Sequence, residues 1–439
     1  MGREHNMRHT SRWLAAPAAT LGVTLTLGMT ALVSPSGAAA QHRAGADPVT
    51  LTFLNAYTGS QVTALQNTII PKFERENPGI KVTNISVPYS DLLKKYLAEA
   101  AAGNPPDVLR SDIAWMAELA GDGTALQVNK LSWYTADGIA KSSLPGPLLT
   151  TEYKGNAYGL PLDTNTTALF WNKTDFAAAG ISSPPKTIPQ LIADAKKLTI
   201  ASKDQYGFGV DSTDIWDVSP FIWSVGGGFT NGSYTTASGF MDSSATRYAV
   251  SLLASGYDGG HGWIGPDIIS TTGDSGEQEF PLGKYAMYID GPWAVATYAA
   301  LKPVPDYGIE AFPTGRGGSH TPTGGEDLVI SKGGHNLADA ELFAQFLTEP
   351  FAQLVQAKVG GEMSSYSTDS AAEVKATPYY AVFASALQNA KVRPVTQYYG
   401  LLDTDFSNAF EEILAGKETV SAGLAQATQQ SDAALAGKG

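Results

Sequence analysis

The chain has 439 residues, of which 43% are hydrophobic and 16% are charged, so it is long enough for two globular domains that each bury a core. Asp and Glu total 42 against 29 Lys and Arg, which gives a net charge of −13. Such an acidic surface repels phosphate backbones and excludes nucleic acid as a partner. The absence of cysteine from the sequence excludes disulfides, cysteine-bound metals, a cysteine nucleophile and lipidation at a signal-peptide cysteine.

Residues 1–40 have the pattern of an export signal. Three arginines precede an uncharged stretch over residues 13–33, and small residues follow up to Ala40. Cleavage after Ala40 fits the small-residue rule, and the alternative is a signal that is retained as a membrane anchor. The sequence therefore predicts an exported protein, extracellular or periplasmic, without a lipidation cysteine.

Strand and helix patterns alternate from about residue 49 onward, which predicts an α/β fold with largely parallel strand pairing. In chain order we expect a strand at 49–54, a helix at 61–76, strands at 80–87 and 107–110 around a helix at 90–102, a strand at 167–172, a helix at 188–198, strands at 207–210, 285–289, 307–312 and 328–331, and helices at 337–347, 378–390 and 405–415. Ligands collect at the carboxyl ends of parallel strands, so residues 55–60 and 111–114 are the first candidate binding loops.

A Gly-Pro-Trp turn follows the apolar strand expected at 285–289. Asp290, Gly291 and Pro292 stop that strand, and Trp293 comes immediately after them. An aromatic face projecting from such a turn can cover the apolar side of a sugar ring. The alternative is that Trp293 is an ordinary buried core residue.

Residue patterns for catalysis and metal binding are missing. The sequence contains no GxSxG nucleophile elbow and no GxxxxGK[ST] phosphate loop. His261, His320 and His335 lie in glycine-rich loops without metal-ligand spacing, and the acidic residues near Asp211 and Asp214 lack the EF-hand pattern. We therefore expect no catalytic residues, no metal site and no cofactor, although the many carboxylates leave a secreted glycoside hydrolase as an alternative.

Six segments in order resemble the extracellular solute-binding proteins of ABC transporters, in particular the carbohydrate-binding group that includes the maltose and maltodextrin-binding proteins. The segments are KFERENPGIKV (72–82), AAGNPPDVL (101–109), GNAYGLPLDTNTTALFWNKTDFAAAGI (155–181), PPKTIPQLIADAKKLT (184–199), FPLGKYAMYIDGPW (280–293) and GGEDLVISKGGHNLADAELFAQFLTEPFAQ (324–353). Their order and spacing cover nearly all of the chain after residue 48.

The resemblance implies two α/β lobes joined by chain crossovers, with a ligand cleft and a hinge between them. The first crossover is expected near residues 158–164 and the second near 312–317. Lobe one then combines residues 47–160 with 313–360, and lobe two combines residues 161–312 with 361–439. Closure of the lobes is a hinge motion that a ligand drives through contacts made better in the closed state.

The resemblance also implies which residues face the cleft. The positions carried over are Asn55, Tyr57, Thr58, Asp112, Asp163, Asn165, Trp216, Asp217, Asp290, Trp293, Gly325, Glu326 and Tyr398. Carboxylates and amides can bind sugar hydroxyls, while aromatic faces cover pyranose rings.

Several of these positions have a second interpretation. Asp112 can cap a helix that starts near Ile113. Asp163 and Asn165 can serve the crossover turn, and Glu326 can lie on the surface. One of Trp216 and Trp223 is expected in the core, with Trp216 assigned to the cleft. The spacing around Tyr398 departs from the maltose-binding pattern.

The function that the resemblance implies is an exported, monomeric, non-enzymatic protein that captures a carbohydrate and delivers it to a membrane ABC permease. A di- or oligosaccharide is expected from the aromatic residues of the inferred cleft, and α-glucosides are expected by family analogy. The alternatives are a secreted glycoside hydrolase and a binding protein for a non-sugar solute such as glycerol phosphate. The missing lipidation cysteine departs from Gram-positive relatives, which commonly use it as a membrane tether.

Overall fold

The computed structural model describes residues 48–134, 138–269, 275–303, 306–366, 373 and 379–437. The export signal expected over residues 1–40 lies outside this range. Within it, no helix combines the length and apolarity that a membrane span requires.

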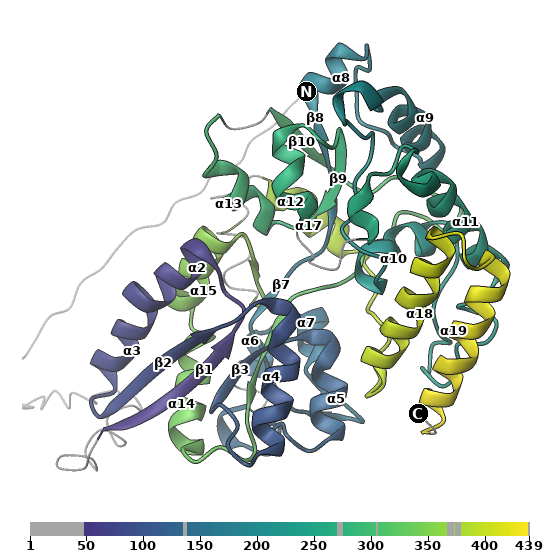
Figure 1. Ribbon diagram of the computed structural model, residues 1–439. Coiled ribbons are helices and arrows are strands. Elements are labelled where there is room, and N and C mark those ends of the chain that lie inside the picture. Colours follow the sequence, from purple (N-terminus) through teal and green to yellow (C-terminus); the bar gives the residue numbers. More distant parts are fainter. Residues whose placement is uncertain are drawn as a thin grey trace, which may run out of the picture. The chain divides into compact units, whose positions relative to one another are not determined.

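The first sheet has five strands in the order β2-β1-β3-β11-β6. Figure 1 labels β1, β2 and β3 of this sheet. These are β1 (Val49–Asn55), β2 (Ile80–Ser86), β3 (Val108–Asp112), β6 (Leu160–Pro161) and β11 (Glu326–Ile330). Strand β1 pairs in parallel with β2 and β3, whereas β11 returns from late in the chain and pairs antiparallel to β3 and β6. The sheet therefore joins the first part of the chain to a distant segment.

Helices cover both faces of this sheet, because successive side chains of a strand point to opposite faces. Phe53 of β1 packs with α3 and α14, while its neighbour Leu54 packs with α4 and α5. In β11, Leu328 and Val329 divide in the same way. The helices of this part are α2 (Gly59–Ala64), the π-helical turn η1 (Leu65–Ile69), α3 (Ile70–Glu76), α4 (Tyr89–Ala101), α5 (Met116–Gly121), α6 (Ile139–Ser142), α7 (Pro145–Thr150), α14 (Leu337–Leu347) and α15 (Pro350–Gly360).

The second sheet has β8 at its centre, with β9 and β10 antiparallel on either side. Alternation again separates two cores: Leu169 packs in the larger cluster with α9, α10 and α18, whereas Phe170 packs with Tyr298 and Phe383. The elements are β8 (Ala168–Asn172), β9 (Met287–Asp290), β10 (Tyr307–Glu310), α8 (Lys173–Ala178), α9 (Ile188–Leu198), α10 (Ile215–Ser224), α11 (Ser244–Tyr257), α12 (Ser275–Glu279), α13 (Trp293–Ala299), α17 (Tyr380–Leu387), α18 (Tyr399–Leu414) and α19 (Val420–Leu435).

Short pairings join the chain segments that run between the two sheets. Strand β7 (Asp163–Thr164) pairs antiparallel with β12 (Met363–Ser364), and Asn165 forms a bridge with Gly324. Three passages of the chain are thus hydrogen-bonded to one another between the sheets. Two further short strands, β4 (Glu152–Tyr153) and β5 (Asn156–Ala157), form a hairpin.

Most expected elements are present, and a few differ from the expectation. Helices α9 and α14 have the expected bounds, whereas the helix expected at 61–76 contains the π-helical turn. The strand expected at 207–210 is wrong: Phe208 and Gly209 form only isolated bridges, to Ile264 and Tyr288. The helix expected at 405–415 begins earlier, at Tyr399, and α19 was not singled out.

Gly325 should tolerate no side chain. Its φ is +122°, and a Cβ there would lie 2.3 Å from the Asp163 carbonyl oxygen. We expect Gly325→Ala to lower the free energy of unfolding by about 1–3 kcal/mol, because it combines backbone strain with a backbone clash. Urea unfolding measures the change. Gly146→Ala is the matched control, since nothing lies within 4 Å of its Cβ position; equal effects of the two variants would contradict the interpretation.

Candidate functional site

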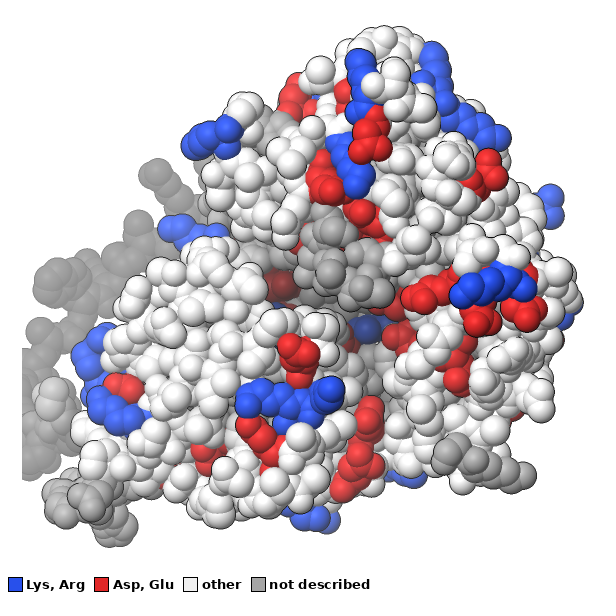
Figure 2. Space-filling view, in the orientation of Figure 1, with Lys and Arg blue, Asp and Glu red and all other residues white. Residues whose placement is uncertain are grey.

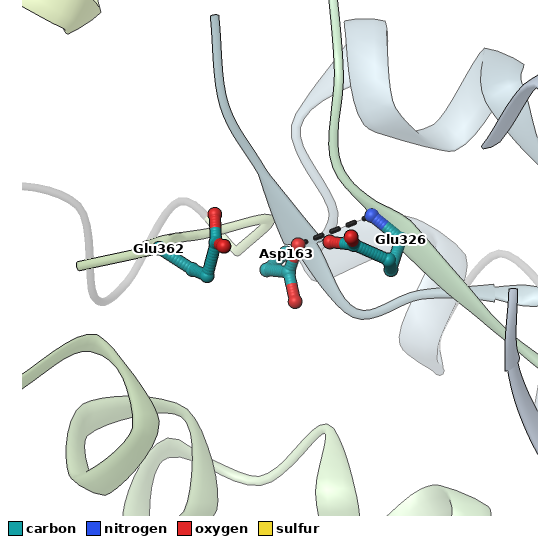
Figure 3. A group of neighbouring side chains, drawn as sticks. All are labelled: Asp163, Glu326 and Glu362. Atoms are coloured by element: carbon teal, nitrogen blue, oxygen red, sulfur yellow. Dashed lines mark hydrogen bonds between the residues drawn. The ribbon is translucent and has the colours of Figure 1, made fainter. Parts of the chain in front are cut away.

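One buried arginine gathers three carboxylates from separate parts of the chain. Nη2 of Arg110, on β3, lies 2.7 Å from Oε2 of Glu326, 3.2 Å from Oδ2 of Asp163 and 3.9 Å from Oε1 of Glu362. These acids belong to β11, to β7 and to the residue before β12, and Figure 3 shows Asp163 between the other two. We call this set the Arg110 cluster.

Burial shifts the pKa values of the side chains in the Arg110 cluster. The four side chains are between 6% and 12% exposed. Burial, reinforced by neighbouring carboxylates, raises the pKa of Glu326 well above its usual value and that of Glu362 to about 8. Burial disfavours the Arg110 charge, but Glu326 and Asp163 outweigh it and hold the pKa of Arg110 well above its usual value.

One oxygen from each of the three carboxyl groups of the Arg110 cluster lies within 4.8 Å of the other two, a spacing that a metal ion can bridge. The guanidinium of Arg110 lies among them and already supplies a positive charge. The cluster is therefore best described as a buried ion network that joins β3, β7 and β11 to the segment before β12.

Two predicted site residues, Tyr57 and Asn165, complete the Arg110 cluster. The guanidinium lies 4.4 Å from the centre of the Tyr57 ring, and Nδ2 of Asn165 donates to Oε2 of Glu362 at 3.0 Å. The backbone N–H of Glu326 donates to Oδ1 of Asp163 at 3.1 Å. Asp163 thus serves the crossover, as its second interpretation held, and Glu326 is paired and largely buried rather than on the surface.

Sequence reasoning missed Arg110 and Glu362. Arg110 lies inside the strand VLRSD, which is buried at all five positions. A charged residue in a buried strand is rarely left unpaired, so it was the available signal for a buried ion pair. Glu362 follows Gly360 and Gly361 in a segment that carried no motif.

A second group forms around Asp112, at the carboxyl end of β3. Its Oδ1 accepts from the backbone N–H of Ala114 at 2.6 Å and from Nη2 of Arg393 at 2.7 Å, while its Oδ2 accepts from the Tyr89 hydroxyl at 2.5 Å. The capping interpretation of Asp112 is confirmed for the 3₁₀ turn η2 (Ile113–Trp115). The same carboxylate also holds a buried arginine.

Two partly exposed tryptophans continue this second group. The Arg393 guanidinium lies 4.9 Å from the centre of the Trp216 ring, and the rings of Trp216 and Trp293 are 6.4 Å apart at 33°. Trp223 is 5% exposed and lies in the core, so the assignment of the core position to Trp223 rather than Trp216 is confirmed. Trp216 lies in helix α10. We call Trp216 and Trp293 the tryptophan platform.

The turn at residues 290–292 sets the position of the Trp293 ring in the tryptophan platform. Trp293 begins helix α13, and its indole lies over Gly291, where an added Cβ would be 2.0 Å from the ring. Oδ1 of Asp290 accepts from the Gly291 N–H at 2.7 Å, and its Oδ2 accepts from the Tyr298 hydroxyl at 3.3 Å. Asp290 therefore holds the turn. Glycine is required at 291 because the ring occupies the space of a side chain.

The remaining predicted residues have local roles in this structure. Asn55 is fully buried and bonded to Asn84 and to the backbone N–H of Tyr57. Thr58 is the N-cap of α2, and Asp217 accepts from Ser212 at 2.7 Å. Tyr398 precedes α18, where its backbone N–H donates to Thr396, and it belongs to neither group. Ligand contact by any of these residues stays a prediction.

The face of the molecule in Figure 2 is hollowed across its middle, and acidic and basic atoms are visible in the hollow. The two groups built above supply paired charges and aromatic surface.

The family model for bacterial extracellular solute-binding proteins matches residues 55–354, and the chain belongs to this family. A Brucella abortus (strain 2308) protein named as a binding protein is 28% identical over 93% of this chain and 98% of its own length. A maltooligosaccharide ABC transporter solute-binding lipoprotein of Streptococcus pneumoniae (strain R6) is 25% identical over 77% of both chains. A solute-binding protein of Thermotoga lettingae, solved with α-D-tagatose, has a TM-score of 0.80 at 22% identity and covers 88% of this chain and 100% of its own.

These comparisons confirm the family resemblance and the two-lobed α/β fold that the sequence predicted. The lobe boundaries given above are not tested by them and stay a prediction.

The raised pKa of Glu362 predicts a pH-dependent stability. The pKa of an unfolded Glu is about 4.3, whereas that of folded Glu362 is about 8. Between these values the folded protein holds a proton that the unfolded chain lacks, so this stabilisation is lost as the pH rises through about 8. We expect the urea-unfolding free energy to fall from pH 5 to 9 less steeply in Glu362→Gln.

The control for this experiment is Glu411→Gln, an exposed carboxylate on α18, which should follow the wild-type pH profile. A Glu362→Gln profile with the wild-type slope would show that this carboxyl does not carry the raised pKa.

Proposed function

We propose that this protein captures a carbohydrate outside the cytoplasm and delivers it to a membrane ABC permease, without chemistry of its own. The observation that carries the proposal is the tryptophan platform, which Arg393 joins to the carboxylate of Asp112. Aromatic faces pack against the C–H surface of a pyranose, while carboxylates accept hydrogen bonds from its hydroxyls. The Streptococcus pneumoniae relative, named for maltooligosaccharide, supports the same ligand class.

Two tryptophans side by side favour a ligand with more than one ring. We infer a di- or oligosaccharide, with α-glucosides first among the candidates, bound by a monomeric exported protein. Both buried arginines already have acidic partners, Arg110 in Asp163, Glu326 and Glu362 and Arg393 in Asp112. A phosphate ligand such as glycerol phosphate would need cations that are not neutralised by the protein, so the pairing supports a neutral polyol.

A thermal-shift screen tests the ligand class. Maltose, maltotriose and maltotetraose are compared with cellobiose, mannobiose, glucose and glycerol phosphate. A ligand at one hundred times its dissociation constant stabilises a protein by about 2.7 kcal/mol, so at least one glycan should raise the melting temperature. A panel in which only glycerol phosphate raises it would overturn the carbohydrate proposal.

The role of the platform is tested by Trp293→Ala. We expect at least about a tenfold rise in the dissociation constant for the best sugar, or about 1.4 kcal/mol, with circular dichroism unchanged. Trp133→Ala is the matched control, because Trp133 packs against a core of the five-stranded sheet, donates to Glu341 and is not part of the tryptophan platform. Gly291→Ala keeps the indole but displaces it, and it should weaken binding as well. Wild-type affinity in Trp293→Ala would exclude the platform as the ligand surface.

Release of reducing ends separates binding from hydrolysis. The best oligosaccharide is incubated with the protein, and we expect no increase in reducing ends over a protein-free control. Turnover at a rate set by protein concentration would favour the glycoside hydrolase alternative.

A further inference from the structure

Arg393 contacts two parts of the molecule, the end of a strand in the five-stranded sheet and a helix that packs in the core of the three-stranded sheet. Its Nη2 donates to Asp112 at the end of β3, in the five-stranded sheet. Its guanidinium also lies over the ring of Trp216, on α10, which packs in the core of the three-stranded sheet. The ring of Tyr399 lies 5.6 Å from the same guanidinium. The Arg393 side chain therefore touches an element associated with each of the two sheets, whichever lobe its own backbone belongs to.

The surroundings of Arg393 favour a fixed geometry. The side chain is 6% exposed, and the carboxylate that it binds is itself held by Tyr89 and by the backbone N–H of Ala114. A planar guanidinium can stack on an aromatic ring and bind a carboxylate at once, which an ammonium group does less well. The contact is therefore a fixed link between Asp112 and the tryptophan platform, and it lies beside the packing of Ala114 and Trp115 into the core that contains α10.

We propose that Arg393 is a positioning residue that latches the tryptophan platform to the end of β3 and stabilises the closed arrangement of the two lobes before any ligand is bound. The Asp112 and Trp216 contacts can form together only when the two cores are close. When the lobes separate, at least one of these contacts breaks. The latch then sets the fraction of ligand-free protein that is competent to hold a ligand.

This fraction has a direct consequence for affinity. The apparent dissociation constant equals the intrinsic constant divided by the competent fraction, so a latch that raises the fraction tightens apparent binding without touching the ligand. The affinity part of the inference rests on the proposed function. The ligand-free conformational part does not.

The absence of cysteine from the sequence makes the conformational test simple. Spin labels are placed on cysteines at two exposed positions, Lys94 on α4 and Lys196 on α9, one beside each sheet. Double electron–electron resonance then gives the distance distribution of the full chain without ligand. Arg393→Gln is compared with wild type, and Lys391→Gln, which removes a cation two residues away, is the matched control.

We expect the ligand-free Arg393→Gln distribution to shift to longer distances, Lys391→Gln to match wild type, and Arg393→Lys to shift less than Arg393→Gln. Where a sugar binds, Arg393→Gln should raise its dissociation constant by about tenfold, while the ligand-bound distances stay those of wild type. Because truncating one partner of a buried pair can unfold a protein, Asp112→Asn with Arg393→Gln provides a second variant without the unpaired charge. Wild-type ligand-free distances in the folded single and double variants would overturn the latch. Failure of every sugar to bind would count only against the proposed function.

Discussion

The ion pairs of Arg110 are the interaction on which the rest of the structure depends. Its guanidinium lies against acids from β7, β11 and the segment before β12, all of which adjoin the passages between the two sheets. Truncating one partner of such a buried set leaves a charge without compensation, and this costs about 3–5 kcal/mol. The cluster fixes where the chain passes from one sheet to the other, and therefore how Asp163, Asn165 and Glu326 are placed.

Arg393 is the second buried arginine, and it contacts the residues that we propose bind the ligand. Arg393 joins Asp112 to Trp216, and Trp293 extends the aromatic surface from the start of α13. Backbone shape makes this possible, because the indole of Trp293 occupies the space over Gly291 and the edge of Trp216 approaches Gly324. The Arg110 cluster thus positions the chain crossovers. Arg393 holds the tryptophan platform beside Asp112, at the end of a strand in the five-stranded sheet.

The sequence predicted the fold well because its signals were local and periodic. Alternation identified β1, and the helix expected at 188–198 has the bounds of α9, which Thr187 caps by accepting from the Gln190 backbone N–H. The strand expected at Gly207–Val210 failed because its pairing depends on distant segments that form only single bridges. Arg110 was missed for a related reason: its three acidic partners lie 53 to 252 residues away, and only the folded chain brings them together. Motif order found Asp112 and Trp293, but the roles of Asn55 and Thr58 in local turns needed coordinates.

The central claim is that the tryptophan platform binds a neutral glycan of more than one ring. Isothermal titration calorimetry with purified malto-oligosaccharides of increasing length, at several temperatures, tests it most directly. The account predicts one site per chain, tighter binding of the disaccharide than of glucose, and a negative heat capacity change from burial of the aromatic faces. Saturable binding of an anionic solute with no heat from any glycan would contradict it.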